Sequence, residues 1–179
     1  PLNLVGDFGG GGMLLAMGIC AALVESSKSG KGQVIDAAMT DGSALLMTMM
    51  YGMYSAGQWK DQRDSNLLDG AAHFYGCYEC KDNKYISIGS IEPQFYAALI
   101  RCMQLDETTF NNQFDQKQWP ELKKIISERF KTKTRDEWCE IFMGNDVCFA
   151  PVLSLQESVD YQHNQDRQTF VEIAGINQP

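Results

Sequence analysis

The 179-residue sequence predicts an α/β protein in which the closing part of a doubly wound sheet is joined through a linker helix to a smaller α+β domain. Three observations lead to this fold class. First, an apolar helix pattern is followed by a short β-branched run and a second helix pattern. Second, a polar stretch then interrupts the chain. Third, two strand-like runs joined by a turn begin a new unit. At about 150 residues per domain, the length suits one domain, or a small domain with part of another. We expect part of a large domain at 1–38, a linker helix and loop at 39–72, a small α+β domain with a short antiparallel sheet at 73–158 and a return linker at 159–179.

The first half of this arrangement begins with four consecutive glycines, Gly9–Gly12, which we interpret as a tight turn. Met13–Val24 is apolar on all sides, which is typical of a helix buried on every face, and the run is shorter than the roughly 20 residues of a bilayer span. Gln33–Asp36 has the composition of a short strand. Thr40–Ser43 offers helix-capping side chains before a second helix that continues to about Ser55.

The second half starts after the polar stretch Gln58–Gly70. Phe74–Cys80 and Tyr85–Gly89 are strand-like and are separated by the polar turn Lys81–Lys84, which predicts a hairpin. The remaining elements follow from periodicity, capping residues and proline positions. They are helices beginning at Glu92-Pro93, over Trp119–Phe130, over Arg135–Met143 with Thr134 as cap and over Ser154–Tyr161, and an edge strand Phe149–Leu153 containing Pro151.

The charge balance excludes some classes of partner. Fifteen Lys and Arg against 23 Asp and Glu give a net charge of −8, the wrong sign for neutralising a phosphate backbone. We therefore expect no nucleic-acid partner. The six cysteines accompany no secretory leader, so we interpret them as reduced thiols of an intracellular protein.

Metal binding and histidine chemistry have weak signals. Cys77 and Cys80, with His73 nearby, hint at zinc, but a structural zinc site needs a second pair of ligands, so we expect no metal. His73 and His163 are the only histidines, and a single histidine in a loop is more often a surface residue than a catalyst.

Asp7, just ahead of the glycines, is the residue that favours a functional interpretation of this segment. Asp7-Phe8-Gly9 lacks the companion motifs of a kinase, and no Gly-Lys-Ser/Thr follows the glycines as in a phosphate-binding loop. Glycine N–H groups at a helix start could bind an anion, although close helix packing explains the same glycines equally well. An acid at this position could act as a base or a nucleophile.

Five of the nine methionines crowd into the second helix region: Met39, Met47, Met49, Met50 and Met53. They could form a methionine-rich core or a deformable surface for acyl chains. The spacing alone favours a core.

Four segments together carry a family resemblance. They are PLNLVGDFGGG at 1–11, GKGQVIDAAM at 30–39, NLLDG at 66–70 and IEPQFY at 91–96. They resemble the α-methylacyl-CoA racemases of the family III CoA-transferase superfamily over nearly the whole chain, and the last segment looks particular to the racemase branch. One departure is Ala72-His73 before the aromatic pair, where racemases generally have a small residue and Pro.

The resemblance implies both a fold and a reaction. The early residues would be the edge of a Rossmann-like large domain, and the chain, which has no initiator Met, would be a fragment that lacks the N-terminal part and its catalytic His. Asp7 would be the acidic base, and Glu92 would support the His. The reaction would be racemisation of 2-methyl-branched acyl-CoA thioesters by two-base proton transfer through an enolate. We expect this fragment alone to be inactive.

The resemblance also implies the surroundings of the reaction. No separate cofactor is expected, since coenzyme A is part of the substrate, and the enzyme would form an interlocked homodimer in mitochondria or peroxisomes. The expected substrate contacts are Gly9, Gly10, Tyr75, Met39, Met49 and Met53. Two alternatives remain: a CoA transferase with Asp7 as nucleophile, and a non-catalytic acyl-CoA-binding or dimerisation fragment.

Overall fold

The computed structural model describes residues 2–179, which form two compact units. One unit ends at Asp61 and the other begins at Gln62, and each is described by itself. Helices and short antiparallel sheets together make a mixed α/β chain, which confirms the mixed class. The doubly wound, Rossmann-like part of the expectation stays a prediction. The boundaries of the four predicted segments stay predictions.

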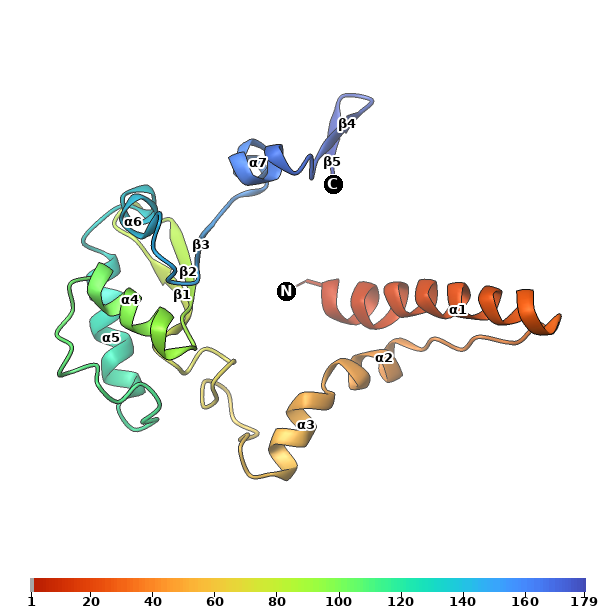
Figure 1. Ribbon diagram of the computed structural model, residues 1–179, viewed down its shortest axis with the longest axis horizontal. Helices are drawn as coiled ribbons and strands as arrows, with labels where there is room; N and C mark the ends of the chain where they lie inside the picture. The colour runs from red at the N-terminus through yellow and green to blue at the C-terminus, as the bar shows by residue number, and fades with distance from the viewer. Residues whose placement is uncertain (1) are drawn as a thin grey trace. The chain divides into compact units, whose positions relative to one another are not determined.

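The first unit consists of helical elements (Figure 1). A π-helix, η1 (Leu4–Met13), runs without interruption into α1 (Leu14–Ser29), which ends at Gly30 in the left-handed conformation with φ of 69°. The expected turn at Gly9–Gly12 is therefore wrong, because these glycines lie inside η1. The second predicted helix is confirmed as two short ones, α2 (Met39–Leu46) and α3 (Thr48–Ser55).

The predicted strand at Gln33–Asp36 is wrong. The segment belongs to no helix or strand and runs back along α1 (Figure 1). Ile35 contacts the helix at Gly18, where an added Cβ would lie 3.1 Å from its Cγ2 atom. A strand needs a neighbouring strand to pair its N–H and C=O groups, and residues 2–61 offer none.

The predicted burial of the apolar helix is also wrong in this chain. No residue of α1 is buried, and Leu23 is 66% exposed. Burial needs a partner surface, and the main helix contact of the first unit joins the glycine-rich side of η1 to α2 and leaves α1 open. By length and composition alone the 26-residue segment Leu4–Ser29 could cross a membrane, a property that core helices of water-soluble proteins share.

The second unit is built on a three-stranded antiparallel sheet of order β1-β2-β3. The predicted hairpin is confirmed as β1 (Tyr75–Glu79) and β2 (Tyr85–Gly89). The predicted edge strand is confirmed as β3 (Phe149–Val152), in which Pro151 pairs with Ile86. Because β3 has a neighbour on one side only, the missing N–H of proline is tolerated there.

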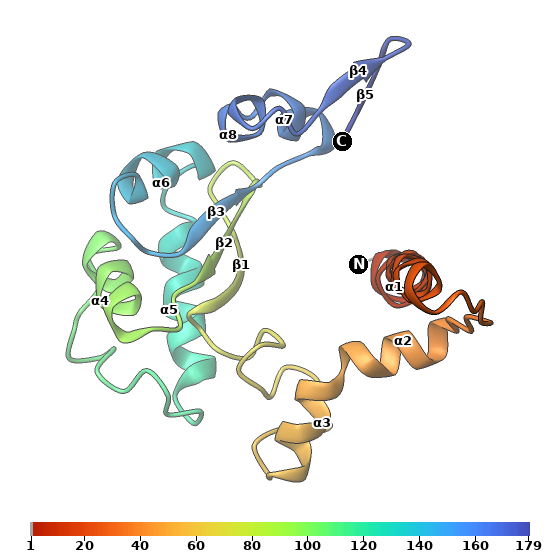
Figure 2. The ribbon, with the colours of Figure 1, turned by 45° about the vertical axis from the view of Figure 1, so that its right-hand side comes forward.

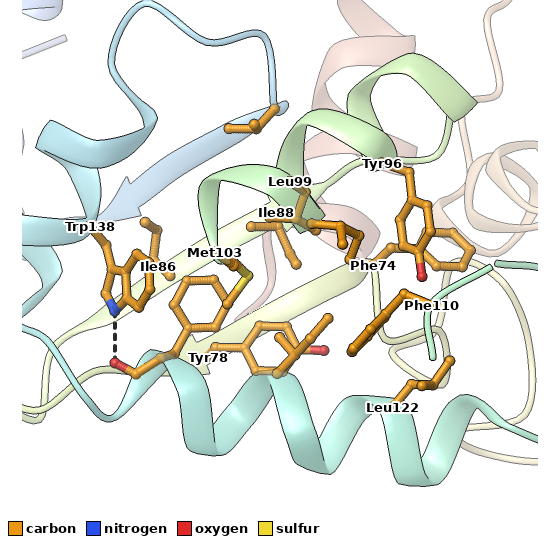
Figure 3. Packing of buried hydrophobic residues seen from close by; sticks show 14 of the residues in the cluster. Phe74, Tyr78, Ile86, Ile88, Tyr96, Leu99, Met103, Phe110, Leu122 and Trp138 are labelled. Atoms are coloured by element: carbon orange, nitrogen blue, oxygen red, sulfur yellow. Dashed lines mark hydrogen bonds between the residues drawn. The ribbon is translucent and has the colours of Figure 1, made fainter. Parts of the chain in front are cut away.

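Three helices, α4 (Pro93–Cys102), α5 (Trp119–Phe130) and α6 (Arg135–Phe142), lie on the same side of this sheet in both ribbon views (Figure 2). The predicted start of α4 and the predicted bounds of α5 and α6 are confirmed within a residue or two. Between the helices and the sheet lies a core dominated by aromatic rings and large aliphatic side chains (Figure 3). The indole N–H of Trp138 donates to the carbonyl oxygen of Phe130 at 2.8 Å, so even the polar atom of this buried ring is paired.

Capping side chains define the helix starts near the end of the chain. Thr134 closes a capping box with Glu137 at α6, as predicted, and Ser154 closes a second with Glu157 at α7 (Leu155–Asp160). The chain continues through α8 (Gln162–Asp166) and a hairpin of β4 (Val171–Ile173) and β5 (Ile176–Gln178). Neither α8 nor this hairpin was predicted.

Candidate active site

Asp7 lies in the first turn of η1, with its side chain exposed. Its backbone N–H donates to the carbonyl oxygen of Asn3 at 3.1 Å. Because residues 4–13 are helical, the N–H groups of Gly9–Gly12 belong to the helix ladder, and the unpaired N–H groups of a helix lie in its first turn. The anion-binding turn, one of the two interpretations of these glycines, is therefore not formed in the described chain.

The glycines after Asp7 serve close packing instead, which is the structural alternative given above. Gly10 and Gly42 touch through their backbones, and a Cβ added at Gly42 would overlap the carbonyl oxygen of Gly10. A Cβ at Gly10 would lie 2.8 Å from the backbone nitrogen of Ser43, and one at Gly11 would lie 3.0 Å from Met39 Cγ. Only glycine allows η1 and α2 to approach so closely.

This contact places the start of α2 beside Asp7. Gly6, Asp7, Met39, Thr40 and Ser43 line a hollow of about 440 Å³, in which Asp7 is the only charged side chain. The predicted base and one of the predicted substrate contacts thus share one surface. Thr40 and Ser43 were predicted as helix-capping residues, but α2 begins at Met39 after Ala38, so both hydroxyl side chains lie within the helix.

The prediction of a methionine-rich core is wrong. Met39 is 51% exposed, Met47 and Met49 are similarly open, and the other two are half-buried. Met47 and Met50 line a second hollow, of about 260 Å³, with Tyr51, Tyr54, Trp59 and Asp61. Met49 and Met53 belong to neither hollow.

Glu92 lies in the second unit, at the N-cap position of α4 directly before Pro93. Its carbonyl oxygen accepts the first helical hydrogen bond, from Tyr96 N–H at 3.0 Å. Its side chain is exposed and makes no capping hydrogen bond, so the carboxylate is not used to start the helix. Asp7 and Glu92 therefore each present an exposed carboxylate, on separate units.

Tyr75, another predicted substrate contact, begins β1 and is half-buried, with its ring over Gly89. The loop before it is fixed by Asp69, whose carboxylate accepts from Asn66 N–H at 2.9 Å and Ser65 N–H at 3.1 Å. Burial alone would raise the pKa of the Asp69 carboxyl, but hydrogen bonds from Asn66, Ser65 and Ala71 outweigh it and lower the pKa. The NLLDG segment therefore has a structural role in shaping this loop.

His73 was predicted to lie on the surface, and this is wrong, because its side chain is 0% exposed. Its Nε2 atom lies 2.7 Å from the Tyr96 hydroxyl, and its Nδ1 atom has no hydrogen-bond partner. The rings of Phe74, Tyr96 and Phe110 surround the imidazole. Burial lowers the pKa of His73 to about 4. The Phe74-Tyr75 pair that follows was the sequence signal for this burial, because a residue directly before an apolar strand often lies in the core with that strand.

The cysteines share one chemical state but differ in exposure. Cys20, Cys77, Cys80, Cys102, Cys139 and Cys148 are all free thiols. Cys77 is exposed whereas Cys80 is buried, and burial raises the pKa of the Cys80 thiol to about 11. Within residues 2–179, no group of three or more His, Cys, Asp or Glu side chains could hold a metal ion.

Comparison with known proteins gives the chain its family. The chain is 44% identical to a protein of Mus musculus named alpha-methylacyl-CoA racemase over 171 residues, covering 96% of this chain and 45% of the mouse protein. The Homo sapiens protein of the same name is 43% identical with the same coverage. The chain thus spans about half the length of these relatives.

The solved structures agree in fold. A crystal structure of Rv3272 from M. tuberculosis superposes with a TM-score of 0.71 at 19% sequence identity, covering 93% of this chain and 44% of that protein. A family profile described as CoA-transferase family III matches residues 2–178. With nearly every described residue inside that match, the chain belongs to CoA-transferase family III.

Proposed function

We propose that the enzyme containing this chain racemises 2-methyl-branched acyl-CoA thioesters. The observation that carries the proposal is the exposed carboxylate of Asp7 beside a hollow lined with Met39 and two hydroxyl side chains. The similarity to proteins named alpha-methylacyl-CoA racemase selects this reaction among those that a carboxylate can perform.

The proposed reaction replaces the proton on the α-carbon by another proton on the opposite face. A base on one face of the α-carbon breaks the C–H bond, the electron pair delocalises onto the thioester oxygen as an enolate, and an acid on the other face returns a proton to carbon. Asp7 serves as one of these two groups. Thr40 and Ser43 line the same hollow, and their hydroxyl groups supply hydrogen-bond donors for the enolate oxygen.

The second acid–base group is an imidazole supported by Glu92. A carboxylate next to a histidine orients the ring and stabilises its charged form. The Glu92 carboxylate is exposed and makes no capping hydrogen bond, so it can take this role. The two histidines of this chain are poor candidates for the imidazole. His73 is enclosed by aromatic rings, and His163 lies in α8, far along the chain from the family motifs.

The acyl chain is proposed to lie along the exposed methionines of α2 and α3. Thioether side chains adapt to irregular apolar ligands, and Met39 and Met49 are about half exposed in this chain, while Met53 is half-buried. Gly9, Gly10 and Tyr75 remain proposed substrate contacts, although Gly10 is buried against α2. An interlocked homodimer and a mitochondrial or peroxisomal location stay predictions.

One experiment separates this proposal from its alternatives. The full-length enzyme is incubated with a single enantiomer of a 2-methylacyl-CoA in deuterated water, and both α-deuterium incorporation and stereochemistry are followed. Exchange with loss of enantiomeric purity is expected. A reaction that needs an added carboxylic acid acceptor would instead indicate a CoA transferase in which Asp7 attacks the thioester, and absence of both reactions would leave only a binding role.

The isolated chain supplies a second test. It should show no exchange at any concentration, since neither of its histidines is expected to reach the substrate. Turnover by the pure chain would identify His73 or His163 as the second base.

A further inference from the structure

The backbone just ahead of Glu92 is held by one buried side chain, Gln113. Its Nε2 amide group donates to the carbonyl oxygens of both Ser90, at 3.0 Å, and Ile91, at 2.8 Å. Gln113 is only 7% exposed, although it lies in the irregular segment between α4 and α5. The two donors of a single carboxamide thus bind the two consecutive peptide carbonyls that precede Glu92.

Gln113 and Ser90 are themselves fixed to the core. The backbone carbonyl oxygen of Gln113 accepts a hydrogen bond from the indole N–H of Trp119, the first residue of α5, at 2.8 Å. Ser90 is fully buried, its hydroxyl donates to Val147 O at 2.6 Å, and its N–H donates to Phe74 O at 3.0 Å. The segment before Glu92 is therefore connected to α5, to the start of β1 and to the loop before β3.

These bonds contrast with the freedom of the Glu92 side chain. The backbone of Glu92 is fixed before it by Gln113 and Ser90 and after it by the helical bond from Tyr96, while its carboxylate makes no capping hydrogen bond. A carboxylate that is to hold an imidazole needs a fixed backbone position and unused hydrogen-bonding capacity, because a misplacement of about 1 Å can cost about a hundredfold in rate.

We propose that Gln113, assisted by Ser90, is a positioning residue that sets the place of the Glu92 carboxylate in the racemase reaction. The inference rests on the proposed function, in which Glu92 supports the catalytic imidazole. Gln113 touches no substrate and acts only through the backbone before Glu92.

The carboxamide of Gln113 can be altered in two ways. Gln113→Met keeps the length of the side chain but removes both N–H donors. Gln113→Glu keeps its shape and places an acceptor against two carbonyl oxygens. Asn112→Asp is the matched control, because it adds the same charge at the exposed neighbouring position.

In the full-length enzyme we expect both Gln113 variants to lower kcat for α-proton exchange by about tenfold or more, with KM for the acyl-CoA within about twofold of wild type. The limb of the pH–rate profile that reports the imidazole should shift, since a displaced Glu92 stabilises its charged form less well. Asn112→Asp should keep wild-type kcat and pH profile. Wild-type kcat in both Gln113 variants would overturn the proposal.

A double-mutant cycle separates positioning from a general loss of structure. In a Glu92→Gln background, adding Gln113→Met should cause little further loss of kcat, whereas losses that multiply would overturn the proposal. If Glu92→Gln itself turns over like wild type, the proposed role of Glu92 fails. If Glu92→Gln is slow while the Gln113 variants are not, only the positioning role fails.

Ser90→Ala covers the case in which the Gln113 variants do not fold, as judged from lost near-ultraviolet circular dichroism. It removes the Ser90–Val147 hydrogen bond and leaves every backbone bond of the segment in place. A lowered kcat with unchanged KM would support positioning. Wild-type kcat in a folded Ser90→Ala variant would overturn it.

Discussion

The two units of this chain use apolar residues in opposite ways. In the second unit Leu99 of α4 is completely buried, together with Phe130, Trp138 and most other large side chains. In the first unit no side chain of α1 or α3 is buried, although these helices are at least as apolar in sequence. Local sequence therefore determines where helices form, whereas burial depends on what the rest of the described chain brings against them.

The largest expected effect tests whether the open first unit carries chemistry. Asp7→Asn in the full-length enzyme should lower α-proton exchange by orders of magnitude in at least one direction, because a carboxamide cannot accept the proton. The melting temperature should stay unchanged, since Asp7 is exposed. Isotope exchange from each pure enantiomer measures both directions, and undiminished exchange in both would remove Asp7 from the mechanism.

The contrast in burial is tested by two equal truncations. Leu99→Ala should destabilise the second unit by about 2–5 kcal/mol, because it leaves a cavity in a closed core. Leu23→Ala, on exposed α1, should change stability by no more than about 0.5 kcal/mol. Urea unfolding of the 179-residue chain measures both, and an equal loss in the two variants would mean that α1 is covered in solution.

Sequence reasoning located the second unit well because its signals are local. The signals are Pro93 before an apolar stripe, Thr134 as a cap before an amphipathic run, and Pro151 in a short edge strand. Each reflects a backbone requirement that a short segment satisfies alone. The hairpin of β1 and β2 follows from alternation around a polar turn in the same way. The structure therefore confirms these elements almost to the residue.

The sequence predictions were wrong where the structure of a segment depends on residues far away in the chain. The expected strand at Gln33–Asp36 needed a partner strand that residues 2–61 do not supply. His73 resembled a loop residue, yet tertiary packing among aromatic rings buries it.

The candidate site was predictable only in part for the same reason. Asp7 and Met39 were singled out separately, and their shared hollow depends on the approach of two glycines 32 positions apart, Gly10 and Gly42. Thr40 and Ser43 enter the site through that approach alone. The Gln113 contacts with Ser90 and Ile91 likewise link positions more than 20 residues apart, so no short pattern could indicate them.

Acid sensitivity should also differ between the units. The pKa of His73 falls from 6.5 to about 4 on folding, because burial penalises the charged ring. The unfolded chain then binds more protons at mildly acid pH, so stability is complete above about pH 6.5 and decreases as the pH falls toward 4. Between pH 7 and pH 5 the second unit should lose about 2 kcal/mol.

Hydrogen exchange at the two pH values, corrected for intrinsic rates, measures this loss in β1 and β2. Both histidines lie in the second unit, so α1 should show no such change. His73→Gln should remove the pH dependence, whereas His163→Gln, at an exposed position, should keep it. A persistent dependence in His73→Gln would assign the effect to another group.

The smallest expected effects concern the backbone contact between Gly10 and Gly42 in the first unit. Gly42→Ala would drive a methyl group into the carbonyl oxygen of Gly10, so η1 and α2 must separate, at a cost of about 1–3 kcal/mol. Gly52→Ala is the matched control in α3, where an added Cβ meets nothing within 4 Å and should stabilise the helix by about 0.5–1 kcal/mol. The midpoint of thermal unfolding, followed by helix content, should therefore fall in Gly42→Ala and rise in Gly52→Ala.

Because the same contact forms the hollow beside Asp7, Gly42→Ala should also lower turnover of the full-length enzyme. A Gly42→Ala variant with wild-type stability and turnover would show that neither the first unit nor its candidate site depends on this helix contact.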